Sequence, residues 1–111
     1  MEAKDFPVFR TLLTEVHTAA FGEPLTKLPH GKAQTLSWLI EEATGEVLSY
    51  KTLGNYVQAA LLNDPAAINP NPSTLSLLVQ YACGPQVQPD ARHGSRMNPS
   101  AEWYRYRSRK L

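Results

Sequence analysis

Breaks that contain proline, glycine or asparagine limit this chain of 111 residues to short helices. Between the breaks, apolar residues recur every three or four positions, which places them on one face of a helix. The spacing predicts helices over residues 6–21 and 32–44, a third helix from Ser49, and a fourth over 72–83. Only the last ten residues alternate as a strand would. We therefore expect an all-α domain, a compact unit of four or five short helices.

Each predicted helix has one apolar face, and these faces are expected to form a common core. Asp5 and Ser49 are suitable N-caps for the first and third helices, and Gly45 suits the left-handed residue that ends the second. The predicted core residues are Phe9, Leu12, Leu13, Val16, Ala20, Ala33, Leu36, Leu39, Ile40, Ala43, Leu53, Tyr56, Val57, Ala60, Leu61, Leu75, Leu78, Val79 and Ala82.

The inventory of reactive side chains argues against an enzyme. The three histidines are dispersed, and Cys83 is the single cysteine, so neither a zinc site nor a disulfide framework is expected. The glycines are scattered rather than gathered in a phosphate-binding loop. We expect no cofactor, no metal and no small-molecule substrate. The chain also lacks an apolar run of about 18 residues, so we expect no membrane association and a cytoplasmic location.

Charge is distributed unevenly along the chain. Residues 1–90 hold five Lys/Arg and nine Asp/Glu, whereas residues 91–111 hold six Lys/Arg and one Glu, which gives net charges of −4 and +5. We therefore divide the chain into a helical domain over 1–84 and a linker with a basic, aromatic C-terminal arm over 85–111. Three partners are open for the arm, namely nucleic acid, an acidic protein surface, or the acidic body of its own chain. Its basic residues are Arg105, Arg107, Arg109 and Lys110.

The layout over about residues 5–84 resembles the helix-turn-helix domain of phage repressors. Ala33-Gln34-Thr35-Leu36 to Gly45 is similar to the first helix of that motif, and Ser49-Tyr50-Lys51-Thr52-Leu53 to Tyr56 is similar to its recognition helix. Asn71-Pro72-Ser73-Thr74-Leu75 is similar to the opening of the next helix. The resemblance implies a DNA-binding protein, a transcriptional regulator without enzymatic activity, whose third helix enters the major groove.

The resemblance also implies which side chains face the DNA. Asn pairs with adenine and Lys donates to guanine or phosphate, and the third helix presents both. No Asp or Glu occurs from Val47 to Asn63, as a groove-facing helix requires. With the basic arm adding phosphate contacts, the residues implied in the body are Gln34, Ser49, Tyr50, Lys51, Thr52, Asn55 and Gln58.

A second interpretation gives the domain a protein partner. Trp38 falls on the face opposite Leu36 and Ile40, and Leu77 and Tyr81 fall on the far side of the fourth helix. Either neighbouring helices or the tail cover these side chains, or they form an exposed apolar patch. In the second case the chain is a protein-interaction or adaptor module that docks a protein partner or forms a homodimer.

Overall fold

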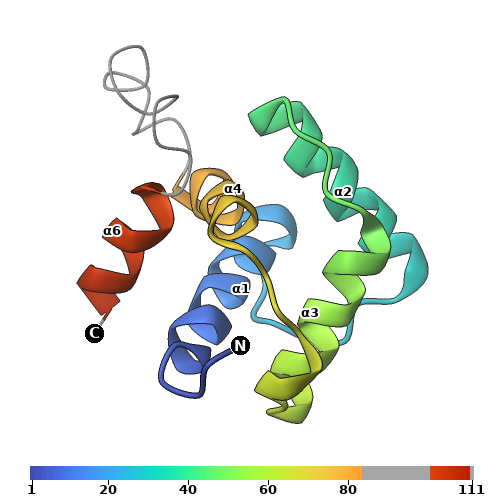
Figure 1. Cartoon of the computed structure of the whole chain (residues 1–111). Helices are drawn as coiled ribbons and strands as arrows, with labels where there is room; N and C mark the ends of the chain where they lie inside the picture. The colour runs from blue at the N-terminus through green and yellow to red at the C-terminus, as the bar shows by residue number, and fades with distance from the viewer. Residues whose placement is uncertain (84–100, 111) are drawn as a thin grey trace.

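The computed structural model describes residues 1–83 and 101–110, and in this part of the chain every regular element is helical (Figure 1). The linker predicted over 85–100 lies outside the described residues. The all-α prediction is confirmed, and α2 begins two residues earlier than expected. None of the described helices combines the length and the apolar character needed to cross a membrane. The elements are α1 (Phe6–Phe21), α2 (His30–Thr44), α3 (Tyr50–Leu62), the short 3-10 helix η1 (Pro65–Ala67), α4 (Pro72–Cys83) and α6 (Ala101–Lys110).

The core forms around α1, which packs against α3 on one side and α4 on the other, while α2 covers α3 and α4 (Figure 1). Phe9 and Leu12 of α1 are fully buried, and the Phe9 ring meets the Tyr56 ring edge to face at 5.5 Å. Burial of such apolar side chains contributes about 1.5–3 kcal/mol each. The apolar faces of the four predicted helices therefore do form one core.

Three residues differ from the predicted core. Leu39 is half-buried and is not part of the core cluster, and the other two lie at helix ends. Ala43 is exposed at the end of α2, and Leu61 is 43% exposed at the end of α3. Both predictions were wrong because periodicity shows the side of a helix but not where its neighbours stop. Ala59, which the pattern left out, is buried instead.

The caps explain where the helices start and stop. The Ser49 hydroxyl accepts a hydrogen bond of 3.1 Å from the Lys51 N–H, so the predicted N-cap of α3 is confirmed. Gly45 ends α2 in the left-handed conformation, with a φ of 79°, as predicted. Asp5 does not cap α1 with its side chain. Pro7 at the start of α1 has no N–H to donate, and the Asp5 carboxylate instead accepts a hydrogen bond from Arg107.

The last ten described residues form a helix that lies against α4 (Figure 1), where a basic C-terminal arm was predicted. Trp103 and Tyr106 are three positions apart, so both rings lie on one face of α6, and they are 3% and 1% exposed in the common core. Alternating aromatic and basic residues fit a strand and a helix equally well over so short a stretch. Packing against α4 decides for the helix.

Candidate nucleic-acid interface

The path of residues 45–49 sets the relation between α2 and α3. The Ser37 hydroxyl donates a hydrogen bond of 2.6 Å to the Leu48 carbonyl, so this linker runs back along α2 (Figure 1). The rings of His30 and Tyr50, the first residues of the two helices, meet edge to face at 4.8 Å. Helix-turn-helix motifs use a turn of three or four residues, which starts the second helix near the end of the first. Here α3 starts beside the beginning of α2.

α3 has one exposed stripe, and it contains three of the predicted binding residues. Lys51, Asn55 and Gln58 follow one another at helical spacing and are all exposed. Tyr50 and Thr52 are half-buried, and the Ser49 hydroxyl is occupied as the cap of the helix. The stripe continues to the exposed Leu62 at the end of α3.

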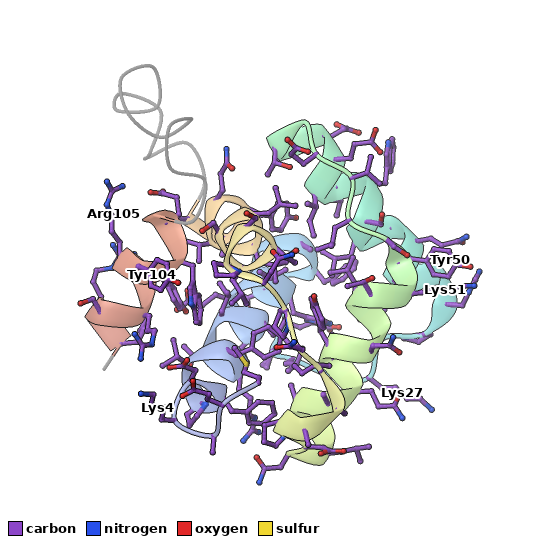
Figure 2. All side chains as sticks on the ribbon, viewed as in Figure 1. Lys4, Lys27, Tyr50, Lys51, Tyr104 and Arg105 are labelled. Atoms are coloured by element: carbon purple, nitrogen blue, oxygen red, sulfur yellow. The ribbon has the colours of Figure 1, made fainter. Side chains whose placement is uncertain are left out.

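Two further residues extend this stripe onto α2 and the segment before it. Figure 2 shows Lys27, Tyr50 and Lys51 on the same side of the molecule. Exposed His30 contacts Tyr50, and Gln34, a predicted residue, is exposed one turn further along α2. Sequence reasoning missed Lys27 and His30, because nothing in the pattern of the connector says which helix start it approaches.

A buried histidine holds the connector that carries Lys27. His17 of α1 is 1% exposed, and its Nδ1 lies 2.9 Å from the Glu23 carbonyl oxygen. The Lys32 ammonium lies 3.4 Å from His17 Nε2 and donates a hydrogen bond of 3.0 Å to the Glu23 carboxylate. The hydrogen bond and the charge of Lys32 lower the pKa of Glu23. These contacts hold Glu23, near the start of the connector, against α1 and α2.

The predicted basic residues of the tail do not join this surface. Tyr104 and Arg105 lie on the opposite side of the molecule from Tyr50 and Lys51 (Figure 2). The basic residues of α6 also interact within the chain, mostly with carboxylates. The partners are Glu102 for Arg105 at 2.7 Å, Asp5 for Arg107 at 2.6 Å, Glu15 for Lys110 at 3.3 Å, and the ring of Tyr106 for Arg109 at 5.9 Å.

These contacts compensate most of the positive charge of α6. Of the three partners left open for the tail, the structure shows contact with the body of the chain. The predicted nucleic-acid residues therefore divide into two groups on opposite sides. Only the group on α2 and α3 contains a cation, Lys51, with neither a carboxylate nor an aromatic partner among the described residues. Lys27 and Lys51 form no ion pair with any residue in 1–83 or 101–110.

The three residues of the alternative protein interface do not form one exposed patch. Trp38 is 61% exposed, whereas Leu77 and Tyr81 are half-buried against the core. Burial raises the pKa of the Tyr81 phenol, as expected for a side chain that has left water. Trp38 is instead flanked by Glu41 and Glu42, one turn further along the same face of α2.

A cavity of about 330 Å³ lies on the α6 side of the molecule, where the Asp5–Arg107 ion pair and Trp103 contribute to its lining. Among the described residues no group of three His, Cys, Asp or Glu side chains could hold a metal ion. No protein-family model, curated protein or solved structure matches this chain. The arrangement of its own side chains is therefore the basis for a functional proposal.

Proposed function

We propose that this protein binds duplex DNA through the exposed stripe of α3 and the adjoining start of α2, as a regulator without enzymatic activity. One observation carries the proposal. Lys51, Asn55 and Gln58 form an exposed row on α3. The sequence segment from Val47 to Asn63, which contains α3, has no Asp or Glu, although the first 90 residues have a net negative charge. A surface that meets phosphates requires this separation of charge.

The side chains have distinct roles in this proposal. Asn55 and Gln58 carry amides, which form paired hydrogen bonds with adenine in the major groove. Lys51 lies one turn earlier on α3, where its ammonium reaches a base edge or a phosphate. Lys27, His30 and Gln34 flank the row and contact the phosphate backbone. The starts of α2 and α3 lie together, so their free N–H groups add positive potential to the same region.

Salt dependence of binding is the first test. We would titrate a labelled random duplex by fluorescence anisotropy at 50 and 200 mM salt, with wild type and with Lys27→Ala/Lys51→Ala. Two lost phosphate contacts should reduce the slope of log K against log salt by about 2. Asn55→Ala/Gln58→Ala should leave this slope unchanged while weakening any sequence preference.

Arg105→Ala/Arg109→Ala is the matched control, because it removes two cations from the opposite side of the molecule. Its affinity for the duplex should equal that of wild type within about twofold. Binding that is lost in this control but retained in Lys27→Ala/Lys51→Ala would assign DNA binding to α6 and contradict the proposal. Absence of salt-sensitive binding at 50 mM would contradict it as well.

Trp38 favours a second function, the docking of a protein on the face of α2 that it shares with Glu41 and Glu42. A tryptophan ring exposed to 61% contributes little to the core, and aromatic side chains are enriched in protein interfaces. Trp38→Ala should therefore change the free energy of unfolding by less than about 0.5 kcal/mol in urea denaturation. A cost of several kcal/mol would show that Trp38 serves the fold and would remove this candidate.

A further inference from the structure

The two ends of α2 differ sharply in charge. Around its C-terminal end Glu41, Glu42 and Glu46 are exposed, together with Trp38 and Val47, which are 61% and 69% exposed. We call these five residues the acidic end. None of the three glutamates forms an ion pair with another described residue. Charged side chains around two exposed apolar ones are typical of an interface with a polar rim.

The acidic end is electrostatically unfavourable in the isolated chain. The C-terminal end of a helix carries partial negative charge, and cations there are stabilising. The last turn of α2 contains no basic residue and two of the glutamates. The repulsion would be relieved by a cationic partner, so the chemistry of this surface calls for positive charge.

The same chain provides a matching surface at the other end of α2. Lys27, His30, Tyr50 and Lys51 gather where α2 and α3 start, and we call these four residues the basic end. Its two lysines have no ion-pair partner among the described residues. α6 is the weaker candidate, because three of its four cations already pair with carboxylates of the chain.

We propose that the acidic end of one molecule docks on the basic end of a second copy, with Glu41 and Glu42 facing Lys27 and Lys51. Trp38 would lie against Tyr50 or a lysine ammonium, contacts that aromatic rings favour. The two surfaces are different, so the contact is heterologous and each added molecule leaves one acidic and one basic end free. The inference rests on the proposed role of Trp38 as a docking surface. The contact would cover the basic end, which is part of the surface proposed to bind DNA.

The interface is small and largely charged, so the association should be weak and sensitive to salt. We would measure the weight-average mass by sedimentation equilibrium from 10 µM to 1 mM, at 25 mM and 500 mM salt. The mass should rise with concentration at 25 mM salt, without a plateau at the dimer, and should return toward the monomer at 500 mM.

Charge reversal on either end gives the decisive comparison. Glu41→Lys/Glu42→Lys and Lys27→Glu/Lys51→Glu should each be monomeric alone, since each lacks one half of the contact. An equimolar mixture of the two should associate again, because the first retains the basic end and the second the acidic end. Arg105→Glu/Arg109→Glu should associate as wild type does. Circular dichroism would verify that each variant is folded.

Several results would overturn the proposal. A wild type that stays monomeric at 1 mM and 25 mM salt excludes it, and so does a mixture of the two charge-reversed variants that remains monomeric. Loss of association in Arg105→Glu/Arg109→Glu would show that α6, and not the basic end, takes part in the contact.

The proposals of this and the preceding subsection fail separately. Trp38→Ala reports through its unfolding free energy whether the ring is free to dock, whatever its partner. An added duplex oligonucleotide should dissociate the assembly if DNA also binds the basic end. If the assembly forms and DNA does not affect it, the DNA proposal fails and head-to-tail association stands.

Discussion

The hydroxyl oxygen of Ser76 on α4 accepts a hydrogen bond of 2.9 Å from the backbone N–H of Trp103 on α6, and both residues are buried. Trp103 is the third residue of its helix, one of the first four whose N–H groups have no partner within the helix. A side chain on a neighbouring helix therefore does the work of an N-cap. This bond joins the sequence-distant α6 to the core and fixes where it starts.

Removing this external cap should destabilise the protein. Ser76→Ala leaves a buried N–H without a partner and should lower the free energy of unfolding by about 1–3 kcal/mol. Urea denaturation monitored by circular dichroism measures the change. Ser73→Ala, at an exposed position one turn earlier on α4, is the control and should cost less than about 0.5 kcal/mol. Equal effects of the two variants would contradict the role given to Ser76.

Tyr106 should make stability depend on alkaline pH. Burial, together with a hydrogen bond of 3.0 Å that its hydroxyl donates to the Glu15 carboxylate, raises the pKa of this phenol well above its usual value. The folded-state pKa exceeds the unfolded one, so the stabilisation is complete below about pH 10 and is lost as the pH rises above it.

Chemical denaturation between pH 8 and 11 tests this expectation. Once the pH passes about 10, the free energy of unfolding should fall by up to about 1.4 kcal/mol per pH unit for such a group. Tyr106→Phe should flatten the fall. Tyr104→Phe, which changes the exposed tyrosine of the same helix, should leave it as in wild type. The fall should not vanish, since burial also raises the pKa values of Tyr56 and Tyr81.

The ion pair between Arg107 and Asp5 should contribute more than the one between Arg105 and Glu102. The Arg107 and Asp5 side chains are half-buried and connect α6 to the start of α1 at 2.6 Å, whereas Arg105 is largely exposed. We expect Arg107→Ala to cost about 1–2 kcal/mol and Arg105→Ala less than about 0.5 kcal/mol. Thermal denaturation at 0.1 and 1 M salt would show both costs. A larger effect of Arg105→Ala would be inconsistent with the structure.

Two glycines should respond to alanine with opposite signs. Gly45 has a φ of 79°, a conformation that alanine adopts only under strain, so Gly45→Ala should destabilise the protein by about 1 kcal/mol. Gly54 lies within α3, and apart from its chain neighbours and the nearby backbone of its own helix no heavy atom is within 4 Å of where its Cβ would be. Gly54→Ala should therefore stabilise the protein by about 0.5–1 kcal/mol. Thermal unfolding of the two variants measures both changes. Destabilisation by Gly54→Ala would contradict the conclusion that a methyl group fits at this position without a clash.

The same Gly54 substitution also bears on the proposed function. If a DNA backbone approaches α3 closely at Gly54, the added methyl group should weaken binding of the duplex although the protein is more stable. Anisotropy titration of Gly54→Ala beside wild type would show this. Unchanged affinity would place the DNA along Lys51 and Asn55 without a close approach at the glycine.

The sequence by itself determined the helical segments and most of their buried faces. Periodicity and breaks suffice for this, because the spacing of apolar residues and the conformational limits of proline and glycine act within a single helix. The Ser49 cap and the left-handed Gly45 were predicted for the same reason. The exposed row of Lys51, Asn55 and Gln58 on α3 was also recognisable, as the opposite face of a predicted core stripe.

Only the tertiary structure decided how these helices and their charges are combined. Whether Trp103 and Tyr106 would pack in the core or remain on an arm depended on a partner surface on α4, which no local pattern in the tail describes. Arg107 pairs with Asp5, and the ring of His30 meets that of Tyr50. In both cases the two residues are far apart in the sequence, and only the tertiary fold brings them together. The sequence predicted that the basic residues of α6 would bind a partner, but most of them pair with carboxylates of the chain itself. Lys27 and Lys51, near the starts of α2 and α3, have no ion-pair partner among the described residues, because ion pairing depends on distance in space.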